Sequence, residues 1–180
     1  LDEYKQIRRF LRTYHISANQ FSSKYRRQLL REYCIFLLTT GMRPGRELLG
    51  LRWKHINHQD GASPASIVNP KGKTGDRPIV PLNSIKPSLR RLEELTKRTG
   101  PEDYVLATPD GEAAKGMSHL VPRAFTDAGL KYVALGRARM AYSFRHTYAT
   151  LLRVYRDYLF DELTENMGNR VEMIQRHYYQ

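Results

Sequence analysis

The feature that most constrains the fold is a long run of helical periodicity that ends at a sharp loop. From Ser22 to Thr40, apolar side chains recur at helical spacing, at Tyr25, Leu29, Tyr33, Phe36 and Leu37. This pattern predicts one long amphipathic helix with Ser22 or Ser23 as its N-cap. Gly41 ends the helix, and Pro44 pushes Arg43 toward extended geometry, so "GMRPG" is predicted to be a loop.

A second pattern predicts a β-hairpin soon afterwards. In residues 65–82, "ASIVNPKGKTGDRPIVPL", two β-branched runs flank a turn rich in Gly, Lys and Asp. Pro78 and Pro81 suit an edge strand, because proline cannot donate to a central ladder. A further short strand is expected within residues 50–57.

The rest of the chain reads as helical. Helices are predicted at 84–98, 118–128, 143–155, 161–167 and 171–179. The expected fold class is therefore α+β and mainly helical, with a small antiparallel sheet near the N-terminal third. At 180 residues the chain is expected to be one domain, residues 1–180, and a fragment of a longer protein.

The charge balance points to a polyanionic partner. Thirty Lys and Arg residues against 18 Asp and Glu residues give a formal net charge of +12. Arginine dominates the excess, which favours bidentate contacts with phosphates. The composition alone favours nucleic acid as the partner, and a soluble basic protein without such a partner is the alternative.

Other composition features exclude several classes of protein. The single cysteine, Cys34, lies in an apolar run and is expected to be a buried, inert thiol in a reducing compartment. No apolar stretch approaches the length needed to span a bilayer. No His or Cys cluster or close carboxylate set has metal-ligand spacing, so no cofactor is expected and the chemistry is predicted to be metal-independent.

Four separated segments each carry a cationic or nucleophilic residue at a loop or element boundary: Arg43, Lys73, Arg145 and Tyr178. Each has an ordinary explanation when taken alone. Arg43 would complement a helix dipole, and Lys73 would protect a hairpin tip against aggregation. Arg145 would lie on the surface, and Tyr178 would pack in the core.

Together the four segments resemble the catalytic domain of the tyrosine recombinases, the phage integrase family. "TGMRPG" resembles the first arginine box, "GKTGDRPIVPL" the hairpin lysine segment, "YSFRHTYAT" the second arginine box and "MGNRVEMIQRHY" the tyrosine box. The resemblance covers about Thr39 to Tyr178. It implies catalytic roles for Arg43, Lys73 and Arg145, and makes Tyr178, rather than Tyr179, the nucleophile.

The sequence departs from the family pattern at three positions. Tyr142 stands where histidine is usual, and Asn169 stands where histidine or tryptophan is usual. The acidic residue of the first box comes one position late, at Glu47, with Arg46 in its place. Tyr142 and Asn169 are still expected to donate hydrogen bonds to a phosphate, so both are counted with the catalytic residues.

These residue types suit phosphodiester cleavage. Two arginine forks neutralise the phosphate oxygens, a lysine at a hairpin tip protonates the leaving 5′ oxygen, and a tyrosine attacks phosphorus. Tyrosine with its ordinary pKa is almost entirely neutral at pH 7, so a basic environment favours the reaction. Residues expected to contact the duplex backbone are Arg52, Lys54, Lys71, Arg77, Arg137, Arg139 and Arg170.

The expected function is therefore site-specific DNA recombination through a 3′-phosphotyrosyl intermediate, for integration or excision of a mobile element. A type IB topoisomerase or protelomerase, or a catalytically silent DNA-binding protein of the same fold, is the alternative. The resemblance implies a missing N-terminal DNA-binding domain and a tetramer on double-stranded attachment sites. The isolated domain is expected to be a monomer, cytoplasmic in a prokaryotic cell and associated with the nucleoid when bound to DNA.

Overall fold

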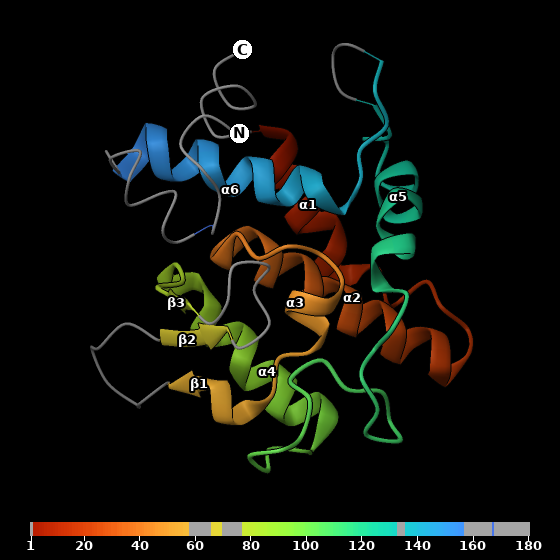
Figure 1. The fold of residues 1–180 in the computed structure, drawn as a ribbon. Helices are drawn as coiled ribbons and strands as arrows, with labels where there is room; N and C mark the ends of the chain where they lie inside the picture. Colours follow the sequence, from red (N-terminus) through yellow and green to blue (C-terminus); the bar gives the residue numbers. More distant parts are fainter. Residues whose placement is uncertain (1, 58–65, 70–76, 133–135, 157–166, 168–180) are drawn as a thin grey trace.

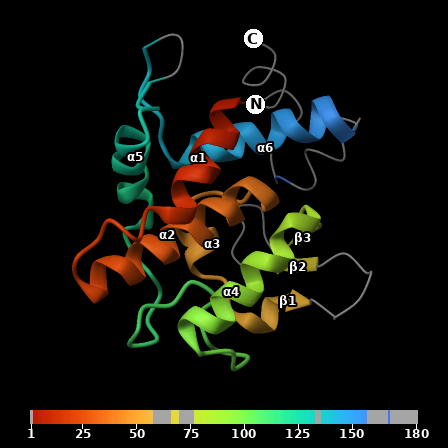
Figure 2. The same ribbon diagram turned by 180° about the vertical axis from the view of Figure 1, so that it is seen from behind.

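The computed structural model describes residues 2–57, 66–69, 77–132, 136–156 and 167. Its helices gather around one central helix, and a small sheet lies against one side of this group (Figure 1). The view from behind brings two of the surrounding helices, α1 and α4, to the front (Figure 2). The predicted α+β, mainly helical class is confirmed.

The central helix is α2, Phe21–Thr40, and its apolar stripe is the one that the sequence predicted. Tyr33, Phe36 and Leu37 are fully buried along it. The predicted N-cap was wrong: Gln20 precedes the helix in extended geometry, and the two serines lie within its first turn. Gly41 ends the helix in the left-handed region at φ 62°, with its N–H donating to the carbonyl oxygen of Leu37.

Four further helices surround α2. They are α1 (Asp2–Thr13), α4 (Lys86–Thr96), α5 (Met117–Asp127) and α6 (Ala141–Arg156). The last three confirm the predictions for 84–98, 118–128 and 143–155 to within a turn at each end. The predicted helices at 161–167 and 171–179 lie outside the described residues, apart from Met167.

The predicted hairpin is confirmed as strands β2 (Ser66–Asn69) and β3 (Arg77–Ile79), paired antiparallel with Ile67 opposite Ile79. A short strand, β1 (Ile56–Asn57), pairs with β2, so β3 is an edge strand that tolerates Pro78. Ile67 and Ile79 are both fully buried, so the same face of both hairpin strands joins the core.

Short helical turns complete the connections. The segment after the first loop forms α3 (Arg46–Leu49), and turns of 3-10 helix occur at η1 (Trp53–His55) and η2 (Asn83–Ile85). The sequence had not predicted α3, which is too short to show a period. Cys34 is buried as expected, and burial raises the pKa of its thiol. Within the described ranges, no helix is long and apolar enough to cross a membrane.

Candidate active site

The first arginine lies in the loop that follows α2. Gly41 turns the chain out of the helix, and Arg43 follows in a loop before α3 begins. Arg43 Nη1 lies 3.4 Å from Glu47 Oε2, and the side chain of Glu47 is only 5% exposed. The one-residue shift of the acidic position is therefore absorbed by α3, whose first turn brings the carboxylate back to Arg43.

The second arginine, Arg145, is a buried cation on the first turns of α6. Only 2% of its surface is exposed. Its Nη1 donates to the carbonyl oxygen of Gly41, and its Nη2 donates to the carbonyl oxygen of Met167 at 2.8 Å. Two backbone carbonyls from distant segments thus fix the guanidinium, and a surface role for this arginine is excluded.

Tyr148, one turn further along α6, packs against the same glycine. A Cβ atom placed on Gly41 would lie 2.4 Å from Tyr148 Cδ1, far inside van der Waals contact. Only glycine therefore allows α6 to approach the end of α2 this closely. That approach brings the Gly41 carbonyl within reach of Arg145.

The segment that follows the hairpin is hydrogen-bonded to the end of α2. The Leu82 N–H donates to the carbonyl oxygen of Thr39 at 2.8 Å, so the chain leaving β3 is hydrogen-bonded to the last turn of α2. Lys73 itself lies outside the described residues. The hydrogen bond shows only that the chain leaving the hairpin passes beside the end of α2, just before the loop that carries Arg43.

The fourth segment reaches the same place through Met167. Its side chain is fully buried and packs with Tyr148, Ala149 and Leu152 of α6, with Leu82 at the edge of the cluster. Asn169 and Tyr178 follow Met167 in the sequence and lie outside the described residues.

Tyr142 and His146 lie on the outer side of α6. Tyr142 is 49% exposed near the start of the helix, and His146 is also exposed. An exposed phenol at a helix start is accessible from solvent, and the hydrogen-bonding role expected of Tyr142 stays a prediction.

Several described tyrosines are poorly suited to act as nucleophiles. Burial raises the pKa of the phenols of Tyr4, Tyr14, Tyr25 and Tyr33. Tyr33 is fully buried, and its neighbours Cys34 and Tyr142 raise its pKa further. A raised pKa disfavours the phenolate, so these four side chains have structural rather than nucleophilic properties.

Two of the predicted duplex contacts lie together around one carboxylate. Lys54 Nζ is 2.7 Å from Glu102 Oε1, and Arg52 Nη1 is 3.4 Å from Glu102 Oε2. The guanidinium of Arg52 also lies 4.5 Å from the ring centroid of Tyr104. The hydrogen bond from Lys54 lowers the pKa of Glu102. The Glu102 side chain is 68% exposed, so its ion pairs with Lys54 and Arg52 are open to solvent and contribute little to stability.

Arg139 has a packing role that the sequence did not suggest. It is 8% exposed and donates to the carbonyl oxygens of Leu130 and Tyr132, and its Nη2 lies 2.6 Å from Glu3 Oε2. A guanidinium with these bonds tethers the segment before α6 to α1, so its donors are occupied within the protein and the predicted duplex contact of Arg139 is wrong. Its neighbour Arg137 is exposed.

The remaining predicted contacts are not located. Lys71 and Arg170 lie outside the described residues, and for Arg77 only the backbone position in β3 is described. Within the described parts of the chain, no three His, Cys, Asp or Glu side chains gather as metal ligands would.

A comparison with known families finds one match that covers most of the chain. The sequence profile of the phage integrase family matches residues 2–167. A comparison with curated protein sequences gave no match.

Solved structures share the fold. XerA recombinase superposes with a TM-score of 0.71 at 19% identity, over 99% of this chain and 58% of that one. A lambda integrase dimer bound to a COC' core site gives a TM-score of 0.72 at 19% identity, over 98% and 46% of the two chains. A post-cleavage complex of XerH recombinase gives 0.68 at 20% identity, over 97% and 48%.

The chain thus spans about half the length of these relatives. The profile match covers most of the sequence, and the fold is that of their catalytic domains. The chain belongs to the phage integrase family of tyrosine recombinases.

Proposed function

We propose that this chain is the catalytic part of a site-specific recombinase that cuts and rejoins DNA through a 3′-phosphotyrosyl intermediate. One observation carries the proposal: Arg145 donates to the carbonyl oxygens of both Gly41 and Met167. These bonds join the second arginine box to the loop of the first and to the start of the tyrosine box. The Leu82–Thr39 hydrogen bond adds the exit of the hairpin segment.

In the proposed reaction, Arg43 and Arg145 stabilise the negative charge that develops on the phosphate oxygens. Glu47 orients Arg43, and the carbonyls of Gly41 and Met167 orient Arg145. Tyr142 and Asn169 donate further hydrogen bonds to the phosphate.

The Tyr178 hydroxyl loses its proton to water and its oxygen attacks phosphorus. The bond from phosphorus to the 5′ oxygen breaks, and Lys73 gives that oxygen its proton. The product is a phosphotyrosyl ester on the 3′ end. Attack by another 5′ hydroxyl reverses the step, so the strand is rejoined without an external energy source.

The finer parts of the proposal rest on relatives. The XerH structure is described as a post-cleavage complex, and one lambda integrase structure as a tetramer bound to a Holliday junction. By analogy, we propose that this protein acts as a tetramer on double-stranded attachment sites and is a monomer without DNA. Arg52, Lys54, Lys71, Arg77, Arg137 and Arg170 are its proposed backbone contacts. Its proposed location is the nucleoid of a prokaryotic cell.

The test is covalent trapping on an attachment-site duplex that is nicked close to the cleavage point, with EDTA present. An SDS-resistant adduct is expected for the wild type and for Tyr179→Phe, and none for Tyr178→Phe. Loss in Tyr179→Phe alone would move the nucleophile by one residue. Absence of an adduct with intact DNA binding would favour a catalytically silent binding protein.

A further inference from the structure

A cationic pocket of about 220 Å³ lies between α1, α2 and α4, on the side that Figure 2 brings to the front. Four arginines line it: Arg8 and Arg12 from α1, Arg31 from α2 and Arg91 from α4. None of them belongs to the motifs of the recombinase site.

The sequence places these arginines by simple helical spacing. Arg8 and Arg12 are four residues apart and share a face of α1. On α2, Ile35 and Leu38 follow Arg31 on the same face, and they form part of the apolar wall of the pocket. The pocket therefore combines an apolar wall with several guanidinium groups.

The only carboxylate bonded to these arginines in the described structure is Glu32, which is buried with a side chain 3% exposed. Arg91 grips it with two bonds, from Nε to Oε1 at 2.8 Å and from Nη2 to Oε2 at 3.0 Å. Ser88 donates to Oε2 at 2.5 Å, and Arg31 Nε lies 3.4 Å from Oε1. In the described structure this one negative charge is bonded to Arg31 and Arg91, and to neither Arg8 nor Arg12.

Two of the four arginines have no carboxylate partner among the described residues, so their guanidinium groups can bind an anion. Arg12 has no hydrogen-bond or ion-pair partner among the described residues, and Arg8 donates to the Tyr4 hydroxyl, which carries no charge. Burial lowers the pKa of Arg31, and the like charges of Arg91, Arg12 and Arg8 lower it further, against the opposing effect of Glu32. An anion in the pocket would relieve this repulsion.

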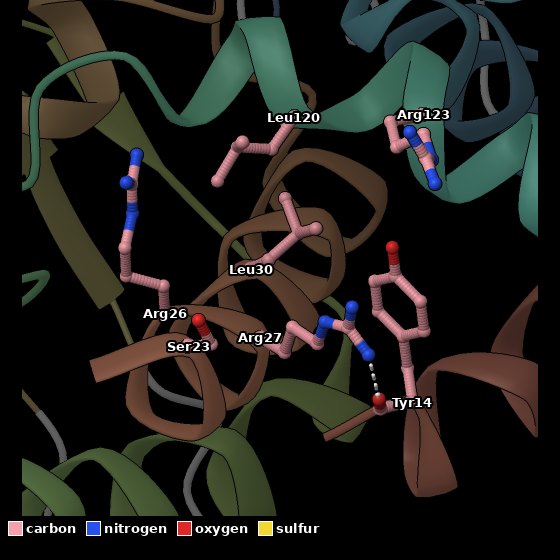
Figure 3. Close-up of a pocket in the computed structure, with 7 residues that line it drawn as sticks. All are labelled: Tyr14, Ser23, Arg26, Arg27, Leu30, Leu120 and Arg123. Atoms are coloured by element: carbon pink, nitrogen blue, oxygen red, sulfur yellow. Dashed lines mark hydrogen bonds between the residues drawn. The ribbon is translucent and has the colours of Figure 1, made fainter. Parts of the chain in front are cut away.

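A second pocket beside α2 is also lined by arginines, but two of these are bonded to groups of the protein (Figure 3). There Arg27 donates to the Tyr14 carbonyl oxygen at 3.0 Å and lies 4.2 Å from the Tyr14 ring centroid, and Arg123 Nε is 2.9 Å from Asp127 Oδ1. Those charges are engaged by the protein itself. Arg26, exposed at the edge of that pocket, is a matched control on the same helix.

We propose that the pocket between α1, α2 and α4 binds a phosphate-class oxyanion, either a phosphate monoester or a pyrophosphate. Guanidinium forks match phosphate oxygens in bidentate geometry, and the excess of positive charge suits an anion that carries more than one negative charge. The small volume suits the anionic group with little apolar material attached.

The pocket also reaches the recombinase site through Thr39. This residue lines the pocket, and its carbonyl oxygen accepts the hydrogen bond from Leu82. A bound phosphate would therefore lie beside the turn of α2 that precedes Gly41.

The test is isothermal titration calorimetry of the chain with sodium pyrophosphate. The ionic strength is held constant, so that the screening of charges does not change during the titration. Saturable binding is expected in the wild type, about tenfold weaker in Arg12→Gln and unchanged in Arg26→Gln. Both arginines are exposed, so both variants are expected to fold. Lack of saturable binding, or equal weakening in the two variants, would overturn the proposal.

Competition identifies the source of the phosphate. If a short DNA duplex displaces pyrophosphate and binds about tenfold more weakly to Arg12→Gln, the ligand is a phosphate of nucleic acid. If pyrophosphate remains bound in the presence of the duplex, the ligand is a free phosphate compound. Either result leaves the assignment of a phosphate site in place, and neither depends on whether Tyr178 cleaves DNA.

Discussion

Arg145 is hydrogen-bonded to the carbonyl oxygen of Gly41, a residue 104 positions earlier in the chain. Both ends of this contact are buried, and the ring of Tyr148 closes over the same glycine. The contact fixes a catalytic candidate on α6 relative to the loop that carries Arg43, and it makes the end of α2 the structural centre of the proposed site.

Replacing Gly41 is expected to damage both stability and the site. In Gly41→Ala, the left-handed φ costs about 1–2 kcal/mol, and the overlap with Tyr148 adds about 1–3 kcal/mol. Gly129→Ala is the matched control, because Gly129 has φ 72° but nothing within 4 Å of the added Cβ. Urea unfolding of both variants isolates the contribution of Tyr148. Equal destabilisation would mean that the ring yields freely.

The planar, two-armed guanidinium of Arg145 is expected to contribute more to stability and cleavage than its positive charge alone. Arg145→Lys keeps a cation but cannot reach both the Gly41 and Met167 carbonyls in the same geometry. We expect a loss of about 2–3 kcal/mol in the free energy of unfolding and a fall in covalent adduct formation of about a hundredfold or more. Arg26→Lys, at an exposed arginine on α2, is the control and should match the wild type in both measurements.

Neutralising Glu47 tests whether the carboxylate that α3 brings beside Arg43 supports catalysis. Glu47→Gln leaves Arg43 without its carboxylate and is expected to slow cleavage about ten- to a hundredfold. DNA binding should remain within about twofold, because a positioning residue adds little to affinity for the duplex backbone. The exposed Glu94→Gln is the control. If cleavage by Glu47→Gln equals that of the control, the Arg43–Glu47 pair has no role in catalysis.

The contact between Tyr14 and Asp127 predicts a stability change in acid. Burial acts to raise the pKa of Asp127, but hydrogen bonds from Tyr14 (2.6 Å) and Arg123 outweigh it and leave the pKa lowered. Because the folded-state pKa lies below the unfolded value of about 3.9, the stabilisation is complete above that pH. It is lost as the pH falls from there through the folded-state pKa.

Urea unfolding of wild type and Asp127→Asn from pH 7 to pH 2 measures this change. The wild type should be more stable at pH 7, by about 1 kcal/mol for a partly exposed group, and the difference should shrink below pH 4. The exposed Asp110→Asn serves as the control. A difference that stays constant across this range would show that the hydrogen bonds do not depend on ionisation.

Local patterns in the sequence determined much of this protein. Helical spacing and Gly41 defined α2, β-branched runs defined the hairpin, and the order of the motifs indicated the family. These features depend on backbone geometry and side-chain periodicity within short segments, which the sequence displays directly. The serine N-cap was wrong because several polar residues near a helix start satisfy the same local rule, and packing selects among them.

The tertiary structure decided what the motifs contact. The sequence predicted a cation at Arg145 but not its burial under two carbonyls, and it predicted a surface contact where Arg139 is instead tied to Glu3. In the sequence, Glu47 stands one position later than the family pattern places its acidic residue. In the structure, one turn of α3 brings its carboxylate beside Arg43. Nor did the sequence predict the gathering of Arg8, Arg12, Arg31 and Arg91 around one pocket. Each outcome depends on which helices approach one another, because burial and charge proximity arise only when distant segments pack.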